Sequence, residues 1–211
     1  MKYLIVNGDD FGASRGINRG MLEAHWRGIL TSASLMVNRL AAEEAAMLGR
    51  MAPELSVGLH FELAGTAGNC LVELSSQLAR FEQLMERPPT HLDSHHNVHR
   101  NPALLPCFLE MAWEHGLPLR EHSPVRYFSK FYGQSGRETH LEQISPESLT
   151  RMLQSEIEDG ITELSCHPDM SRRIIHPATP PNAKPNCEPC ATRACATCSW
   201  SSRFNSSAIM I

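Results

Sequence analysis

Alternating strand and helix signals over residues 1–168 constrain the fold of this chain more than any other feature of its sequence. Short runs of apolar and β-branched residues alternate with segments in which apolar side chains recur every three or four positions. This alternation is typical of a parallel sheet with helices packed outside it. Strands are expected at residues 3–6, 29–37, 55–61, 90–93, 117–120 and 161–166, and helices at 14–27, 41–51, 71–86, 102–115 and 145–158.

Local signals define several boundaries of these elements. Ser145 followed by Pro146 is typical of a helix N-terminus, and Gly116 stands where a helix C-cap is expected. Residues 121–144 show no regular pattern and carry several aromatic side chains, so we expect a long irregular segment there. Loops of that length inside a compact domain are usually functional.

Unusual polar residues gather at the carboxyl ends of the predicted strands. In parallel α/β barrels the catalytic groups lie on the loops that follow the strands. We therefore expect one rim of the sheet to carry the chemistry of this chain. That rim would hold Asp9 and Asp10 after the first strand, His60 at the end of the third, Asp93 and His95 after the fourth, Arg120 at the end of the fifth and His167 at the end of the sixth.

Residues 91–99 contain four of the eleven histidines of the chain. Neutral imidazole is the commonest side-chain metal ligand, which favours a metal site here. The alternative is a polar loop that happens to be rich in histidine. The other residues have ordinary explanations when taken singly: Asp9-Asp10 suits a turn, His60 a buried core position and Arg120 a buried salt bridge. Their common position on one rim favours a functional site over these alternatives.

One carboxylate with two histidines is a ligand set that hydrolytic metal sites use, with positions left open for water and substrate. Consecutive strand side chains point to opposite faces, so Asp9 and Asp10 are not expected to be ligands together. One would bind the metal and the other would remain free as a general base. His167, followed by the rigid Pro168, is a candidate acid for a leaving amine.

Five ordered motifs resemble those of the YdjC-like carbohydrate deacetylases: NGDDFG at 7–12, TSASLMV at 31–37, GLH at 58–60, PTHLDSH at 89–95 and CHP at 166–168. The resemblance covers residues 1–168. It implies an α/β fold, a distorted (β/α) barrel of the polysaccharide-deacetylase and glycoside-hydrolase type, and metal-dependent removal of an N-acetyl group from an amino sugar. The segments 93–100 and 119–128 are similar to the hopanoid-biosynthesis subgroup, which implies an N-acetylglucosaminyl group on a hopanoid lipid.

Carried over by these motifs, the metal ligands would be Asp10, His60 and His95, around one divalent ion, Zn²⁺ or Mg²⁺. Asp9 would be the base that activates water, and His167 the acid that protonates the sugar nitrogen. Further residues would orient the ligands or bind substrate: Asp93 as the orienting partner of His95, and His96, Asn97 and His99 as candidates for lining the sugar site. Arg120 is a candidate for either of these two roles.

Charge and hydropathy exclude several other classes. A net charge of −4 and a pI near 6.2 give no electrostatic basis for binding nucleic acid. No apolar run approaches the ~20 residues that span a bilayer, and the apolar start is too short for a signal peptide. We expect a cytoplasmic protein without a transmembrane segment, acting on an amino-sugar or glycolipid substrate, with a homo-oligomer left open. The rivals are a hydrolase of another ester or amide, and a non-catalytic carbohydrate- or metal-binding remnant.

The composition changes after residue 168. Residues 169–211 are rich in proline and hold four of the seven cysteines, so we divide the chain into a barrel at 1–168, incomplete at its C-terminus, and an irregular tail at 169–211 that is not a native domain. A zinc site in the tail is disfavoured, because only four residues separate its two Cys-x2-Cys pairs, Cys187/Cys190 and Cys195/Cys198.

A second reading frame offers another explanation of this tail. A GC-rich back-translation of residues 181–196, read two bases later, encodes a charged amphipathic helix start similar to that of the hopanoid-associated subgroup. We therefore hypothesise an out-of-frame tail that begins near Asp169.

Overall fold

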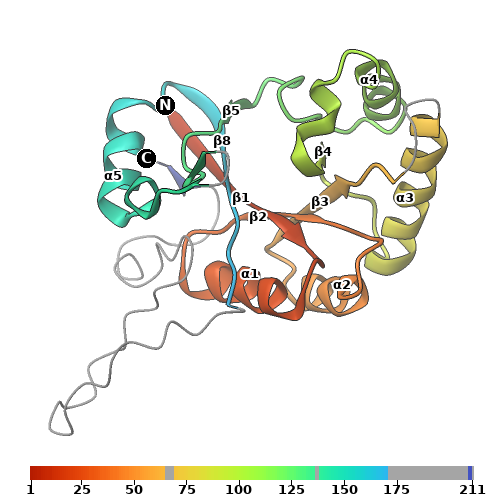
Figure 1. Ribbon diagram of the computed structural model, residues 1–211, viewed down its shortest axis with the longest axis horizontal. Coiled ribbons are helices and arrows are strands. Elements are labelled where there is room, and N and C mark those ends of the chain that lie inside the picture. The colour runs from red at the N-terminus through yellow and green to blue at the C-terminus, as the bar shows by residue number, and fades with distance from the viewer. Residues whose placement is uncertain (65–68, 136–137, 171–208, 211) are drawn as a thin grey trace, which may run out of the picture.

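The structure is a computed structural model that describes residues 1–64, 69–135, 138–170 and 209–210. Six parallel strands curl into an open barrel in the spatial order β4-β3-β2-β1-β8-β5 (Figure 1). The predicted α/β fold with a distorted barrel is therefore confirmed. The strands are β1 (Lys2–Phe11), β2 (Ser32–Leu35), β3 (Ser56–Phe61), β4 (Leu92–Ser94), β5 (Arg126–Phe128) and β8 (Gly160–Cys166).

The helices lie around the outside of the curled sheet (Figure 1). The N-terminal cap predicted at Ser145 forms, since its Oγ accepts from Ser148 N at 3.1 Å, and Ser14 caps the first helix in the same way. Gly116 has the positive φ of 63° that suits the predicted helix end. The α-helices are α1 (Arg15–Arg27), α2 (Ala42–Met51), α3 (Cys70–Met85), α4 (Leu105–Glu114) and α5 (Pro146–Ser155), with 3-10 helices η2 (His95–Arg100) and η3 (Leu141–Ile144).

The two faces of β1 show where the core and the barrel interior lie. A Cβ on Gly8 would lie 2.2 Å from Met21 Sδ, so this position of the strand faces α1 at close range. Because strand side chains alternate, Leu4 and Val6 share that face, and each is only 3% exposed within the hydrophobic core. Asp9 has the opposite parity and points into the barrel.

Three predicted elements differ from those observed. Residues 117–120 form no strand, because Pro118 has no N–H for a ladder and Leu119 makes only an isolated parallel bridge to Leu92. The segment 121–144, expected to be irregular, contains β5, a hairpin of β6 (Gln134–Ser135) and β7 (Glu138–Thr139), and η3. The strand expected at 29–37 shortens to β2.

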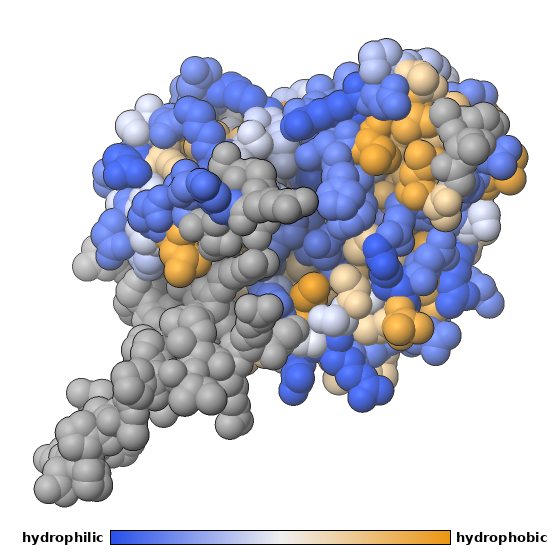
Figure 2. All heavy atoms as spheres, viewed as in Figure 1, coloured by the Kyte–Doolittle hydropathy of each residue, from blue (hydrophilic) through white to orange (hydrophobic). Residues whose placement is uncertain are grey.

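The remaining described pairing joins β9 (Ile209–Met210) to β1 in antiparallel orientation. Most of the tail, including its four cysteines, lies outside the described residues. The face drawn in Figure 2 is mainly hydrophilic, with an apolar patch over α3 and α4, whose exposed side chains include Val72 and Leu109. Within the described ranges, no helix has the length and apolar character needed to cross a membrane.

Candidate active site and its relatives

A cavity of about 500 Å³ opens at the carboxyl ends of β1, β3, β4 and β8. This is the rim on which the sequence placed its candidate residues. Another part of the wall comes from Tyr127, Phe131, Tyr132 and Ile144. The predicted residues that line the cavity are Asp9, Asp10, His60, His95, His96 and His167, together with Asn97, whereas Asp93, His99 and Arg120 do not line it.

A β-bulge in β1 brings Asp10 to the same cavity as its neighbour Asp9. The register of β1 against β2 shifts between Gly8 and Phe11, and Asp10 adopts a left-handed backbone with a φ of 70°. The alternation of side chains is interrupted at such a bulge, so Asp9 and Asp10 both line the cavity. The expectation that their side chains would point to opposite faces is wrong for this reason. Left-handed backbone at a non-glycine residue is costly and is concentrated at functional sites.

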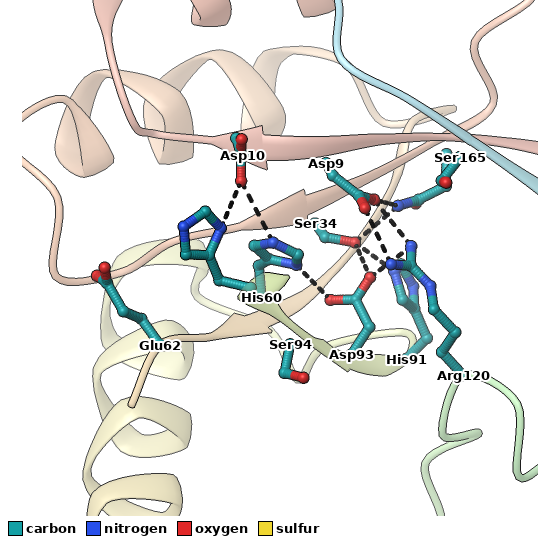
Figure 3. A network of polar contacts seen from close by, with 12 residues as sticks. Asp9, Asp10, Ser34, His60, Glu62, His91, Asp93, Ser94, Arg120 and Ser165 are labelled. Carbon is teal, nitrogen blue, oxygen red and sulfur yellow. Dashed lines mark hydrogen bonds and ion pairs between the residues drawn. The ribbon is translucent and has the colours of Figure 1, made fainter. Parts of the chain in front are cut away.

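Asp10, His60 and His95 converge on one point of the cavity wall. Asp10 Oδ1 lies 3.3 Å from His60 Nε2 (Figure 3). The same oxygen lies 3.1 Å from His95 Nδ1. One potential ligand atom from each residue lies within 4.8 Å of the others. Burial acts to raise the pKa of Asp10, but hydrogen bonds from the two imidazoles outweigh it and lower this pKa well below its usual range. An ionised carboxylate with two imidazoles fits a divalent cation.

Asp93 orients His60 rather than His95. Asp93 Oδ1 lies 2.7 Å from His60 Nδ1, and the carboxylate is fully buried (Figure 3). This bond leaves the His60 Nε2 atom facing Asp10. A carboxylate of this kind fixes the tautomer and direction of a metal-ligating histidine. The predicted pairing with His95 is wrong because the β3–β4 register places His60 directly opposite Asp93.

Arg120 joins the buried carboxylates beneath the cavity. Its Nη1 and Nη2 donate to the two oxygens of Asp9 at 2.9 and 2.8 Å, and its Nη2 lies 2.7 Å from Asp93 Oδ2 (Figure 3). Burial acts to raise the pKa of Asp9, but the Arg120 charge and hydrogen bonds outweigh it, so this pKa is lowered. A second cluster of Asp9, His60 and Asp93 also has closely spaced ligand atoms. Arg120 already bridges its two carboxylates with a positive charge, so this cluster is a poor cation site.

His167 faces the same point from the end of β8. Its Nε2 lies 3.9 Å from Asp10 Oδ2, and its ring meets the Tyr132 ring edge-on with centroids 5.2 Å apart. The loop behind it packs tightly on α1, because a Cβ on Gly20 would lie 2.9 Å from the Pro168 carbonyl. Glycine at position 20 therefore allows the close approach that places His167 at the cavity.

The histidines that follow β4 divide between the cavity and the core. His96 and Asn97 have left-handed backbone, with φ of 55° and 52°, and both line the cavity. The buried Asn97 Oδ1 has no hydrogen-bond partner among the described residues, so it can accept from a bound molecule. His99 is fully buried against Phe108, with its Nδ1 2.6 Å from Ser94 Oγ. Its place behind the cavity wall contradicts its predicted contact with the sugar.

The sequence interpretation missed several buried partners of this network, among them Asn7, whose Nδ2 donates to Asp9 Oδ1 and to Ser34 Oγ at 2.8 Å each. Ser34 Oγ donates to Asp93 Oδ2 at 2.8 Å, and Glu163 Oε1 accepts from Arg120 Nη2 at 2.6 Å. The sequence did contain a signal for Glu163. Side chains in a strand alternate between two faces, so Glu163, four positions before His167, is expected on the same face as His167. Ser34 lies inside the TSASLMV motif at 31–37, which was a signal for it.

Comparisons with known proteins identify the family of this chain. The family model of YdjC-like proteins matches residues 3–72 and 67–195. A carbohydrate deacetylase from Geobacillus stearothermophilus is 36% identical over 204 residues, covering 79% of this chain and 79% of the relative. A chitooligosaccharide deacetylase from Klebsiella pneumoniae is 35% identical over 212 residues, covering 82% of this chain and 84% of the relative.

Solved structures share the fold. A protein from Enterococcus faecalis V583, described as a cellobiose-phosphate cleavage protein, has a TM-score of 0.64 and 27% identity, covering 80% of this chain and 81% of that one. A family 4 carbohydrate esterase from Streptomyces lividans has a TM-score of 0.50 at 13% identity, with 80% of each chain covered, which shows likeness of fold alone. The sequence match over most of its length shows that this chain belongs to the YdjC-like protein family.

Proposed function

We propose that this protein is a metal-dependent carbohydrate N-deacetylase, a hydrolase that removes an N-acetyl group from an amino sugar. One observation carries the proposal: the Asp10, His60 and His95 cluster shares a cavity with an ionised Asp9 and with His167. The names of the relatives support the same reaction class, since two of them are a carbohydrate deacetylase and a chitooligosaccharide deacetylase.

The proposed metal ligands are Asp10 Oδ1, His60 Nε2 and His95 Nδ1. Two features of this set suit a divalent ion. Asp93 binds His60 through Nδ1, which leaves Nε2 available to a metal, and the three ligand residues line the cavity. A bound Zn²⁺ or Mg²⁺ would polarise the amide carbonyl and make an adjacent water molecule more acidic.

The protein's own groups would move the protons. Asp9 would accept a proton from the attacking water, whose oxygen bonds to the acyl carbon. His167 would donate a proton to the sugar nitrogen as the C–N bond breaks, which leaves acetate and a free amine. Arg120 would keep Asp9 ionised and oriented, since it binds both Asp9 oxygens.

The remaining cavity wall would bind the sugar. Tyr132 and Tyr127 present aromatic rings, and Asn97 Oδ1 offers a buried acceptor without a partner among the described residues. His96 lies beside them on the left-handed segment of η2. These groups suit a ring with apolar faces and hydroxyl or amide edges.

The finer substrate that we propose is an N-acetylglucosaminyl group on a hopanoid lipid. The similarity of residues 93–100 and 119–128 to the hopanoid-associated subgroup supports it. A soluble N-acetylated chitooligosaccharide is the competing substrate, because it is the one named for a relative. Acetate release from both compounds, compared by kcat/KM, separates these two substrates. Faster turnover of the chitooligosaccharide would exclude the lipid as the preferred substrate.

Acetate release by the purified chain tests the reaction class. We expect release from an N-acetylglucosamine conjugate with Zn²⁺ or Mg²⁺ present, its loss after chelation, and its return when the metal is restored. An O-acetylated sugar and cellobiose phosphate serve as comparison substrates. Faster turnover of either would favour another hydrolase. Metal binding without any release would favour the non-catalytic remnant.

A further inference from the structure

We propose that Glu163, on β8 beneath the cavity, is a positioning residue for the deacetylation: it holds the Arg120 guanidinium in the orientation in which Arg120 binds Asp9. Glu163 would act in the same reaction, so this inference rests on the proposed function. Glu163 does not line the cavity.

Two carboxylates hold the Arg120 guanidinium along two different edges. The Nη1–Nη2 edge donates to both oxygens of Asp9, at 2.9 and 2.8 Å. The Nε–Nη2 edge donates to one oxygen, Glu163 Oε1, at 2.9 and 2.6 Å. A planar guanidinium bound along two edges cannot turn within its plane. Glu163 therefore fixes the direction in which Arg120 presents its other edge to Asp9.

The other contacts of Arg120 do not supply this constraint. The Tyr127 ring lies over the guanidinium, 4.9 Å from Cζ to the centroid, and restrains its plane but not its direction within that plane. Asp93 Oδ2 lies 2.7 Å from Arg120 Nη2, the same nitrogen that donates to Asp9 and Glu163. Nη2 has two hydrogens for these three carboxylates. Without Glu163, we expect Arg120 to turn toward Asp93 and to release part of its hold on Asp9.

Most of the surface of the Arg120–Glu163 pair is shielded from bulk water, although both side chains also line a second cavity of about 390 Å³. The Arg120 side chain is 1% exposed and the Glu163 side chain is 11% exposed. A simpler alternative is that Glu163 only balances buried charge and stabilises the fold. In that case its loss would reduce the fraction of folded protein, but each folded molecule with bound metal would keep the wild-type kcat. Rates per folded, metal-loaded molecule distinguish the two roles.

The test compares five variants of the full chain, one of them a control. Glu163→Met fills the volume but removes the acceptor, whereas Glu163→Gln keeps an oxygen that can accept from Nε and Nη2. Arg120→Lys and the double variant Glu163→Met/Arg120→Lys report whether Glu163 acts through Arg120. Glu158→Met is the matched control, because Glu158 is exposed and pairs with Arg126 away from the cavity. The readouts are kcat, KM and bound metal, with acetate released from N,N′-diacetylchitobiose.

We expect Glu163→Met to lower kcat by roughly ten- to a hundredfold, since a displacement of about 1 Å can cost that much. KM and metal content should stay near the wild-type values. Glu163→Gln should recover most of the loss, and the double variant should be no slower than Arg120→Lys alone. A wild-type kcat in Glu163→Met, or losses that multiply in the double variant, would overturn the assignment.

A nuclear magnetic resonance measurement keeps the two proposals separate. The Arg120 Nε–H proton, assigned by its absence in Arg120→Lys, should exchange slowly in the wild type because it donates to buried Glu163 Oε1. Rapid exchange of this proton would refute the proposal that Glu163 positions Arg120, even if Glu163→Met fails to fold. Slow exchange in a wild-type protein that releases no acetate would instead contradict the proposed function, while the contact between Glu163 and Arg120 would stand.

Discussion

Asp9 and Asp10 are neighbours in the sequence but have different electrostatic partners. Asp9 faces a guanidinium that is fixed in place, and Asp10 faces two imidazoles that a metal could share. Both carboxyl groups have lowered pKa values, Asp9 because Arg120 outweighs burial and Asp10 because the imidazoles do. Both are therefore ionised at neutral pH, and their partners separate a candidate base from a candidate ligand.

Asp9→Asn should retain metal binding and lose turnover. The amide cannot accept a proton from water, and loss of a general base typically costs 10²–10⁴-fold in rate. The measurements are kcat for acetate release and the bound metal per chain, with Asp10→Asn as the comparison that should lose metal. Activity unchanged in Asp9→Asn would remove Asp9 from the mechanism.

Asp93→Ala should weaken metal binding by about 10–100-fold, the usual effect of losing a carboxylate that orients a histidine ligand. Its partner His60 would keep its place on β3 but lose the bond that directs Nε2 toward Asp10. Titration with Zn²⁺ measures the change. Ser34→Ala is the control, because it removes another Asp93 contact and leaves the His60 bond intact. Equal metal affinity in Asp93→Ala and the wild type would contradict this role.

Glu163 should make the folded state less stable as pH rises. Burial raises its pKa to about 7 against the opposing charge of Arg120, whereas the ordinary value is 4.5. The folded state binds the proton more tightly, so this contribution is fully present below pH 4.5 and is lost as pH rises through about 7. Relative to Glu163→Gln, the unfolding free energy of the wild type should fall by on the order of 3 kcal/mol across that window. Urea unfolding at several pH values measures it, and a constant difference would contradict the expectation.

At the scale of elements, the packing of α1 against the end of β8 positions His167. Gly20 meets the Pro168 backbone, and Met170 N donates to Gly16 O at 3.2 Å. Backbone on both sides of this contact leaves little freedom for adjustment. The proposed acid is therefore placed by a helix that carries no catalytic group.

Gly20→Ala should lower kcat while metal binding is kept. The new Cβ would meet the Pro168 backbone at 2.9 Å and push the loop that carries His167. Gly49→Ala in α2 is the matched control, because the atom nearest to its Cβ would be the flexible end of Met85, at 3.2 Å. Alanine favours a helix over glycine by about 1 kcal/mol, so Gly49→Ala should be neutral or stabilising. Equal kcat in the two variants would show that the α1 contact does not position His167.

At the scale of the whole molecule, the barrel remains open within the described residues. Residues 118–120 bond to β4, and β5 pairs with β8, but no ladder between described residues joins these two edges. The family match runs to residue 195, past the predicted boundary at 168. The out-of-frame origin of the tail stays a prediction.

Determining the genomic DNA around codon 169 tests that prediction. We expect a second frame that encodes a charged amphipathic helix in place of residues 169–211. The chain translated in that frame should be more soluble and melt at a higher temperature, because an open sheet edge favours aggregation. A chain truncated after residue 168 is the control. The absence of a better frame downstream of codon 168 would refute the hypothesis.

The sequence alone determined five of the six parallel strands and the five α-helices described, since period-two and period-3.6 patterns are local properties of the chain, but it missed β5. It also placed Asp10, His60, His95 and His167 on one rim, because parallel strands end on the same side of a sheet. Tertiary contacts decided the remainder. The β1 bulge brought Asp10 to the same cavity as Asp9, and the β3–β4 register placed Asp93 opposite His60. The fold alone brought Arg120 and Glu163 together across 43 residues of chain. Register and long-range ion pairs depend on which strands become neighbours, and no local pattern encodes that.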